Sequence, residues 1–180
     1  GNAARVQAVL ESLPPRAQVP VVLDPVLVSS SGGTLLDADG VQLLCRLLLP
    51  RVTLLTPNIP EAASLLSEPP ADGTDNANSA GGGAADEAAL DTQLQRLLAL
   101  GPEAVLIKGG HGSGDHVIDT LAERGRGLVR MAVPRVPVQR RGTGCTLASA
   151  IAARLAGGSS LVEACRSAQS HVVEALARSR

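Results

Sequence analysis

The 180-residue sequence predicts an α/β fold with a largely parallel sheet. Three short apolar runs, at residues 19–23, 52–55 and 104–107, alternate with segments whose apolar residues have helical spacing. Buried parallel strands connected by helices show this pattern. Because hydrophobic residues make up 44% of the chain, we expect one domain with a substantial core.

The composition argues against several classes of protein. A net charge of -1 does not suggest a nucleic-acid-binding surface, and no apolar run approaches the length of a membrane-spanning helix. The three cysteines, Cys45, Cys145 and Cys165, are far apart and lack the spacing of a metal site. This usage is typical of reduced thiols in a cytoplasmic protein. Aromatic residues are absent, so Leu, Val, Ile and Ala must build the core.

The N-terminal third contains two predicted helices around the first strand. Apolar residues at helical spacing begin at Val6, and Pro14-Pro15 ends that helix. The strand at 19–23 is followed directly by Asp24. Asp37 can cap the next helix. The inward face of that helix is predicted to consist of Val41, Leu44, Cys45 and Leu48.

The middle of the chain contains the second and third strands. The run at 52–55 leads into Thr56-Pro57-Asn58-Ile59-Pro60-Glu61, where Pro60 favours the start of a helix. Residues 69–85 are rich in Gly, Ala, Asn, Asp and Pro, which predicts a disordered surface insertion. A helix over 90–98 then precedes the strand at 104–107, which ends at Lys108.

The C-terminal part is predicted to form two strands and two helices. Residues 117–121 and 128–133 have the composition of strands on either side of a turn. Gly142-Thr143-Gly144-Cys145 opens a helix that Gly157-Gly158 ends. The last helix begins with the capping box Ser160-Leu161-Val162-Glu163.

Polar residues follow the end of each predicted parallel strand: Asp24, the segment 56–61 and Lys108. Ligands bind at this edge of open α/β sheets. The Gly142 loop is expected to join them, because unpaired N–H groups and the helix dipole favour an anion at a helix start. Glycine before a helix is also common where it only allows the chain to turn, so this loop alone does not identify a binding site. Together the four loops predict one ligand-binding edge.

Phosphoryl transfer from ATP requires a cation for the phosphate, a magnesium ion and a placed hydroxyl group. Lys108, the only lysine in the chain, could contact phosphate, or it could be a solvated surface residue. Glu61 could hold magnesium through water, or it could complement the dipole of its helix. Asp24 could lie near the metal, or it could be a turn residue before Pro25.

Three further polar residues are ambiguous. Asn58 could bind phosphate or water, or it could be an ordinary turn residue. His111 is better explained by a turn than by catalysis. Cys145 could be a small buried residue. At a helix N-terminus, its pKa is instead expected to fall below the usual value of about 8.5, which would make it a base or an anion contact.

Four motifs, taken in order, resemble the hydroxymethylpyrimidine/phosphomethylpyrimidine kinases of the ribokinase-like superfamily. The resemblance runs from about Val6 to about Val173. It implies a three-layer α/β/α sandwich and phosphorylation of 4-amino-5-hydroxymethyl-2-methylpyrimidine and its monophosphate, with ATP and Mg²⁺, in thiamine biosynthesis. The motifs are Asp24-Pro25-Val26, Thr56-Pro57-Asn58-Ile59-Pro60-Glu61, Lys108-Gly109-Gly110-His111 and Gly142-Thr143-Gly144-Cys145-Thr146.

The resemblance also assigns roles to these residues. Glu61 and Asp24 are implied to be associated with magnesium. Cys145 occupies the place of an aspartate base in sugar and pyridoxal kinases, which favours a pyrimidine substrate. The implied anion hole for the transferring phosphoryl consists of the amides of Gly142, Thr143, Gly144 and Cys145. The implied ATP contacts are Lys108, Asn58, Thr56 and Asp24.

The whole chain is expected to belong to one kinase domain. Residues 1–180 are expected to be the C-terminal two-thirds of a ribokinase-like kinase domain, truncated at the N-terminus and lacking the first strands of its sheet. The expected partners are a small pyrimidine and ATP, without nucleic acid or membrane. A homodimer is left open, as is a plastid location in a plant or alga. The alternatives are pyridoxal kinase activity, a nucleotide-sensing module and a non-catalytic interaction domain.

Overall fold

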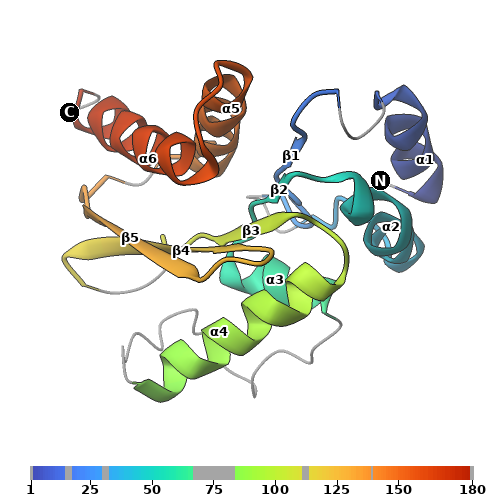
Figure 1. Ribbon diagram of the computed structural model, residues 1–180, viewed down its shortest axis with the longest axis horizontal. Coiled ribbons are helices and arrows are strands. Elements are labelled where there is room, and N and C mark those ends of the chain that lie inside the picture. The colour runs from blue at the N-terminus through green and yellow to red at the C-terminus, as the bar shows by residue number, and fades with distance from the viewer. Residues whose placement is uncertain are drawn as a thin grey trace.

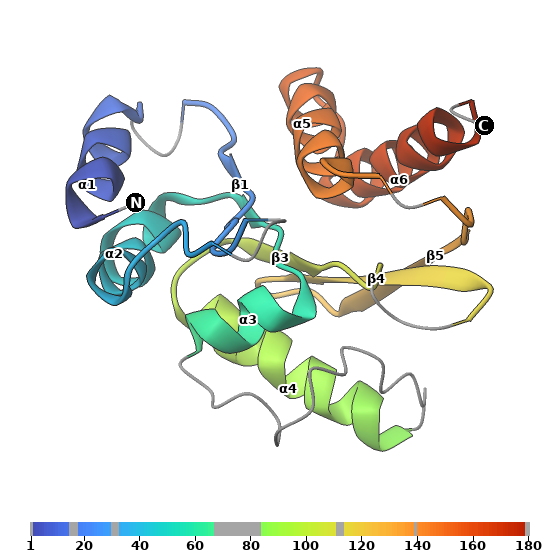
Figure 2. The same ribbon diagram turned by 180° about the vertical axis from the view of Figure 1, so that it is seen from behind.

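A computed structural model shows three layers, with helices on both faces of a central sheet (Figures 1 and 2). It describes residues 2–14, 18–29, 33–66, 84–110, 114–138 and 140–178. The insertion predicted at 69–85 lies outside these ranges, apart from its last two residues, which belong to a helix. His111 also lies outside them.

The sheet contains five strands in the order β1-β2-β3-β4-β5. β1, β2 and β3 are parallel to one another, whereas β4 is antiparallel to both β3 and β5. The sheet is therefore mixed, because the connections after β3 and β4 are too short for the crossover that parallel strands need. The strands are β1 (Val22–Leu23), β2 (Leu54–Leu55), β3 (Ala104–Ile107), β4 (His116–Glu123) and β5 (Leu128–Pro134).

β1 and β2 are shorter than the predicted runs at 19–23 and 52–55, because regular pairing begins only at Val22 and Leu54, although the N–H of Thr53 still donates to the carbonyl of Val21 at 2.9 Å. The N–H of Val21 donates to the Thr53 hydroxyl at 3.0 Å, where a longer ladder would use a backbone carbonyl. The prediction was therefore wrong at the start of both strands. β3 has the predicted bounds.

Helices pack on both sides of the sheet (Figures 1 and 2), and the two cores to which they contribute place four of them on one side and two on the other. The predicted caps are present: Asp37 accepts from the N–H of Gly40 at 2.9 Å, and Ser160 and Glu163 form a capping box. A π-helical turn (Leu44–Leu48) and a 3₁₀ turn (Leu49–Arg51) extend α2. The helices are α1 (Ala3–Ser12), α2 (Ala38–Leu43), α3 (Ile59–Leu65), α4 (Ala84–Ala99), α5 (Thr143–Ala156) and α6 (Leu161–Ala177).

The sheet separates two apolar cores. Along β3, Val105 and Ile107 face the core shared with α1 to α4, whereas Ala104 and Leu106 face the core shared with α5 and α6. This alternation follows from the two-residue period of a strand. Because both faces are covered, all four residues of β3 are buried.

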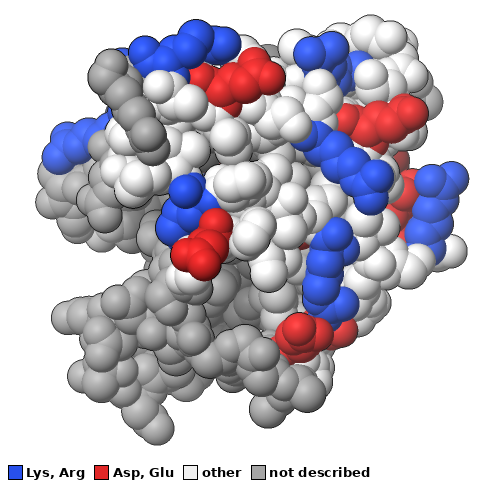
Figure 3. Space-filling view, turned by 90° about the vertical axis from the view of Figure 1, so that its left-hand side faces the viewer, with Lys and Arg blue, Asp and Glu red and all other residues white. Residues whose placement is uncertain are grey.

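Surface charge is dispersed on the face that Figure 3 shows, where Lys and Arg side chains lie among those of Asp and Glu. Within the described residues, no helix has the length and apolar character needed to span a membrane. All three cysteines are free thiols.

Candidate active site

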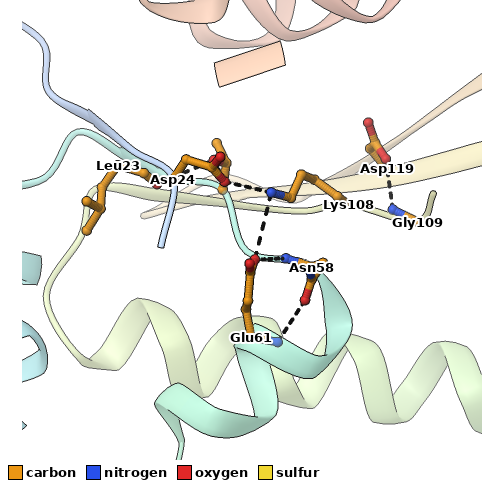
Figure 4. A network of polar contacts seen from close by, with 8 residues as sticks. Leu23, Asp24, Asn58, Glu61, Lys108, Gly109 and Asp119 are labelled. Atoms are coloured by element: carbon orange, nitrogen blue, oxygen red, sulfur yellow. Dashed lines mark hydrogen bonds and ion pairs between the residues drawn. The ribbon is translucent and has the colours of Figure 1, made fainter. Parts of the chain in front are cut away.

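The predicted polar loops meet at the carboxyl ends of the three parallel strands (Figure 4). Asp24 follows β1, Thr56 follows β2 and Lys108 follows β3. The backbone N–H of Lys108 donates to the carbonyl of Pro57 at 2.9 Å, which fixes the end of β3 beside the start of α3. The topology of the sheet thus places these residues together.

The Lys108 ammonium lies between two carboxylates. Its Nζ is 2.7 Å from Oδ1 of Asp24 and 3.8 Å from Oε2 of Glu61. The three side chains are only 12–13% exposed. Lys108 is therefore not a solvated surface residue, and Asp24 is not merely a turn residue. Paired charges with little exposure interact more strongly than charges in water.

Asn58 and Glu61 form the capping box of α3. The Asn58 side chain accepts from the N–H of Glu61 at 2.8 Å, and Oε2 of Glu61 accepts from the N–H of Asn58 at 2.8 Å. The interpretation of Glu61 as a first-turn residue of its helix is thus confirmed, whereas its association with magnesium stays a prediction; the same oxygen also lies 3.8 Å from Nζ of Lys108. The capping role of Asn58 leaves its amide nitrogen as the group that could meet a ligand.

Thr56 is fully buried beneath this cluster. Its hydroxyl lies 3.4 Å from the carbonyl oxygen of Leu23 and 3.4 Å from Oδ1 of Asp24. Its predicted contact with ATP stays a prediction, and its side chain has no exposed surface in this arrangement. Its single hydroxyl proton can be donated to one of these two oxygens at a time, so its contact with Asp24 is a weak one.

The first turn of α5 lacks a side-chain cap. Gly142 is the N-cap, with a φ of 82° that favours glycine, and it has no side chain to accept from the first-turn N–H groups. The hydroxyls of Thr143 and Thr146 donate to the carbonyls of Arg140 and Gly142, at 2.7 and 2.9 Å. This helix start therefore offers backbone donors to an anion.

Gly144, in the first turn of α5, lies next to the ion pair between Lys108 and Asp24. A Cβ at this position would lie 3.2 Å from Nζ of Lys108 and 3.8 Å from Oδ2 of Asp24. A larger residue would press on the ammonium. Glycine therefore lets the N-terminus of α5 approach the two charged groups closely.

Cys145 departs from both expectations made for it. The residue is exposed rather than buried. Its pKa is raised, first by partial desolvation of the sulfur and then by hydrogen bonding to Asp24 and by the charge of that carboxylate. The charge of Lys108 opposes this shift. The predicted lowering of the pKa is therefore wrong, because desolvation of the sulfur and, after it, the nearby Asp24 carboxylate outweigh the groups that favour the thiolate.

Asp119 is a polar residue near the site that the sequence motifs do not include. It is 3% exposed and accepts from the N–H of Gly109 at 2.8 Å and from Nε2 of Gln169 at 2.7 Å. Burial raises its pKa, and the two hydrogen bonds and the charge of Lys108 oppose that shift. The sequence feature that could have identified Asp119 is a single acidic residue among the apolar residues of β4.

Asp24 and Glu61 have chemistry that suits a magnesium ion. No group of three or more His, Cys, Asp or Glu side chains that could hold a metal occurs in the described ranges. Mg²⁺ nevertheless needs only one or two carboxylates, because it keeps several waters and also binds substrate phosphates. The two carboxylates on either side of Lys108 meet that requirement.

The chain matches the phosphomethylpyrimidine kinase family over residues 1–180. It is 38% identical over 156 residues to the hydroxymethylpyrimidine/phosphomethylpyrimidine kinase of Rhizobium meliloti, covering 86% of this chain and 53% of the relative. It is 42% identical over 149 residues to the protein of the same name from Salmonella typhimurium, covering 82% and 51%. The thiamine biosynthesis bifunctional protein ThiED of Geobacter sulfurreducens is 38% identical over 157 residues, covering 87% and 29%. The chain spans about half the length of the first two relatives.

Solved structures share the fold. The pyridoxal kinase of Staphylococcus aureus in complex with pyridoxal superposes with a TM-score of 0.77 at 26% identity, covering 98% of this chain and 59% of that one. The phosphomethylpyrimidine kinase of Clostridium difficile gives 0.62 at 28% identity, covering 97% and 74%. These similarities confirm the predicted ribokinase-like α/β fold.

We predict that Lys108→Met lowers the free energy of unfolding by about 1–3 kcal/mol, because two little-exposed carboxylates lose their shared cation. Urea denaturation measures the change. Arg178→Met is the matched control, since its 3.6 Å ion pair with Glu174 is 66% exposed on both sides and should contribute little. Equal effects of the two substitutions would contradict the prediction.

We also predict that Asp24→Asn lowers the pKa of Cys145, because it removes the charge that helps to raise that pKa. Alkylation by iodoacetamide follows the thiolate, so the midpoint of its rate against pH should move to lower pH. Peptide mass spectrometry separates Cys145 from Cys45 and Cys165. Asp39→Asn, in the first turn of α2, is the control. A midpoint that stays in place or rises would show that Asp24 does not control the thiol.

Proposed function

Because the chain belongs to the phosphomethylpyrimidine kinase family, we propose that the protein containing it is an ATP-dependent kinase of 4-amino-5-hydroxymethyl-2-methylpyrimidine and its monophosphate. The product would be the diphosphate used in thiamine biosynthesis. One observation supports this best: a little-exposed lysine, paired with two carboxylates, lies directly beneath an uncapped helix start. A cation and backbone donors together suit a transferring phosphoryl group.

The proposed anion hole is the first turn of α5. The amides of Gly142, Thr143, Gly144 and Cys145 would face the transferring phosphoryl, and Lys108 would neutralise part of its charge. Both elements are held before any ligand binds, α5 by its apolar core and Lys108 by Asp24. Preorganised donors need no rearrangement when charge develops on the phosphoryl group.

ATP and Mg²⁺ are the proposed cofactors. Glu61 and Asp24 would hold the metal, partly through water, while Lys108 and Asn58 would contact the phosphates of the nucleotide. Thr56 would support this set through its weak contact with Asp24. When bound, magnesium would neutralise phosphate charge and align the leaving group.

Cys145 is the proposed group beside the acceptor hydroxyl. Its raised pKa means that the thiol keeps its proton at neutral pH, so it is not a ready-made thiolate base. The charge of the nearby Asp24 carboxylate contributes to this raised pKa. A base role would therefore require the Asp24 carboxylate to take the thiol proton as the sulfur receives the proton of the acceptor hydroxyl.

Pyridoxal kinase activity is the second candidate, favoured by the fold shared with the Staphylococcus aureus enzyme. Its identity of 26% is lower than the 38% and 42% shared with two pyrimidine kinases. Cys145, in the place where the resemblance puts the aspartate of pyridoxal kinases, also favours the pyrimidine. We propose that residues 1–180 form one part of the kinase domain. An absence of nucleic-acid and membrane partners, a homodimer and a cytoplasmic or plastid location remain predictions.

The proposed function predicts phosphorylation of the hydroxymethylpyrimidine by the whole protein with Mg-ATP, in two steps that ³¹P NMR can separate. Lys108→Met should abolish turnover and serves as the negative control. Phosphorylation of pyridoxal in place of the pyrimidine would establish the second candidate. If neither acceptor reacts and millimolar Mg-ATP leaves the melting temperature unchanged, the non-catalytic alternative is supported.

Cys145→Ala should lower turnover by about 100-fold, in the range of a lost acid–base group. Because the residue is exposed, the free energy of unfolding should change by less than about 1 kcal/mol. Ser149→Ala, an exposed position on the same helix, should leave turnover unchanged. Wild-type turnover in the Cys145 variant would remove this thiol from the mechanism.

A further inference from the structure

Asp119 is a buried acid that the proposed chemistry does not use. It lies on β4, and its two carboxylate oxygens have different partners. Oδ1 accepts from the N–H of Gly109 at 2.8 Å, and Oδ2 accepts from Nε2 of Gln169 at 2.7 Å (Figure 4 shows the first contact). A buried carboxylate is tolerated only when it is hydrogen-bonded, so this pairing is specific.

The Asp119 side chain takes the place of a backbone acceptor just beyond the point where the pairing of β3 with β4 ends. Backbone pairing of β3 with β4 ends at Ile107 and Thr120. Two residues further on, the N–H of Gly109 is bound by the Asp119 side chain instead of by the β4 backbone. A Cβ on Gly109 would collide with the carbonyl oxygen of Ile118, so the two chains approach too closely there for any other residue. The carboxylate therefore fixes the peptide bond that joins Lys108 to Gly109.

Gln169 connects this carboxylate to α6. Its Nε2 also lies 3.4 Å from the carbonyl oxygen of Met131 on β5, and the residue is 4% exposed. Cys165, one turn earlier on α6, has its pKa raised to about 12 by burial and by the charge of Asp119. Asp119 thus lies at the boundary between β4, β5 and the helical layer.

We propose that Asp119 is a positioning residue for Lys108. By holding the peptide that follows Lys108, it sets the direction in which the lysine side chain leaves β3 toward Asp24 and Glu61. Gln169 holds Asp119 in turn, so α6 contributes to the placement of the ammonium. The identity of the ligand that Lys108 binds rests on the proposed kinase function. The positioning of the Lys108 side chain by Asp119 does not depend on that function.

The composition of the chain provides a selective probe of this peptide. Lys108 is the only lysine, so Lys108–Gly109 is the only peptide bond with a lysine carbonyl and a glycine nitrogen. Labelling with ¹³C-carbonyl lysine and ¹⁵N-glycine therefore gives one cross-peak from residues 1–180 in a carbonyl–nitrogen correlation spectrum, which its loss in Lys108→Met identifies in the whole protein. Reductive ¹³C-methylation reports on the Lys108 amine, whose resonance the same variant identifies. Neither measurement requires catalytic activity.

The test compares Asp119→Asn with the wild type, both in the whole protein. The substitution keeps the side-chain shape and removes the charge that strengthens the bond to Gly109. We expect the Lys108–Gly109 cross-peak to shift, exchange of that amide proton to accelerate about tenfold, and kcat/KM for ATP to fall about 10- to 100-fold. Melting temperatures determine the range in which both proteins are folded.

Thr120→Val is the matched control. Thr120 is the next residue of β4 and is also buried, but its hydroxyl has no hydrogen-bond partner within the described residues. Valine has nearly the same shape, so the cross-peak and kcat/KM should stay at their wild-type values. If Asp119 acted only on stability, its variant would differ from this control in melting temperature alone.

Each outcome decides the proposal. An unshifted cross-peak in Asp119→Asn would overturn it, and so would a shifted cross-peak with wild-type kcat/KM. If the wild-type protein phosphorylates neither acceptor, the proposed function fails. The ¹³C-methyl resonance of Lys108 then decides the placement: a change in Asp119→Asn supports the positioning role, and an unchanged resonance overturns it.

Discussion

The ion pair between Lys108 and Asp24 joins residues that are 84 positions apart, and the rest of the site is arranged around it. Glu61 shares the ammonium from the start of α3, and Gly144 allows α5 to rest on it. Without the cation, two carboxylates would remain in a little-exposed position, which is costly. The Lys108 ammonium offsets the repulsion between the Asp24 and Glu61 carboxylates, so both can lie at the carboxyl ends of the strands.

Much of this arrangement follows from local patterns. The four residues of β3 form an uninterrupted apolar run, and Gly142 and Gly157 mark the ends of α5, so both elements have the predicted bounds. Once three strands are taken as parallel, residues that follow them must lie along one edge. Asp24, Thr56 and Lys108 could therefore be grouped before any contact between them was known.

The remaining features depend on partners distant in sequence. The pKa of Cys145 is raised by desolvation and then by Asp24, and no spacing rule relates that carboxylate to the thiol. Where β1 and β2 begin, the N–H of Val21 donates to the Thr53 hydroxyl in place of a backbone acceptor, which a strand pattern does not reveal. Asp119 was missed because a single acid in a strand pattern does not reveal that Gly109 and Gln169 will enclose it.

The division of the interior into two cores has a mechanical consequence for the site. Glu61 belongs to α3, whose Ala62 and Leu65 pack in one core, whereas Gly144 belongs to α5, whose Leu147 and Ile151 pack in the other. Lys108 itself lies at the end of β3 and is paired with Glu61 at 3.8 Å. An anion held by both the α5 amides and Lys108 would therefore connect α5 to the edge of the sheet and, through Glu61, to the opposite layer. A bound anion would thus stabilise the arrangement of the two layers that forms the site.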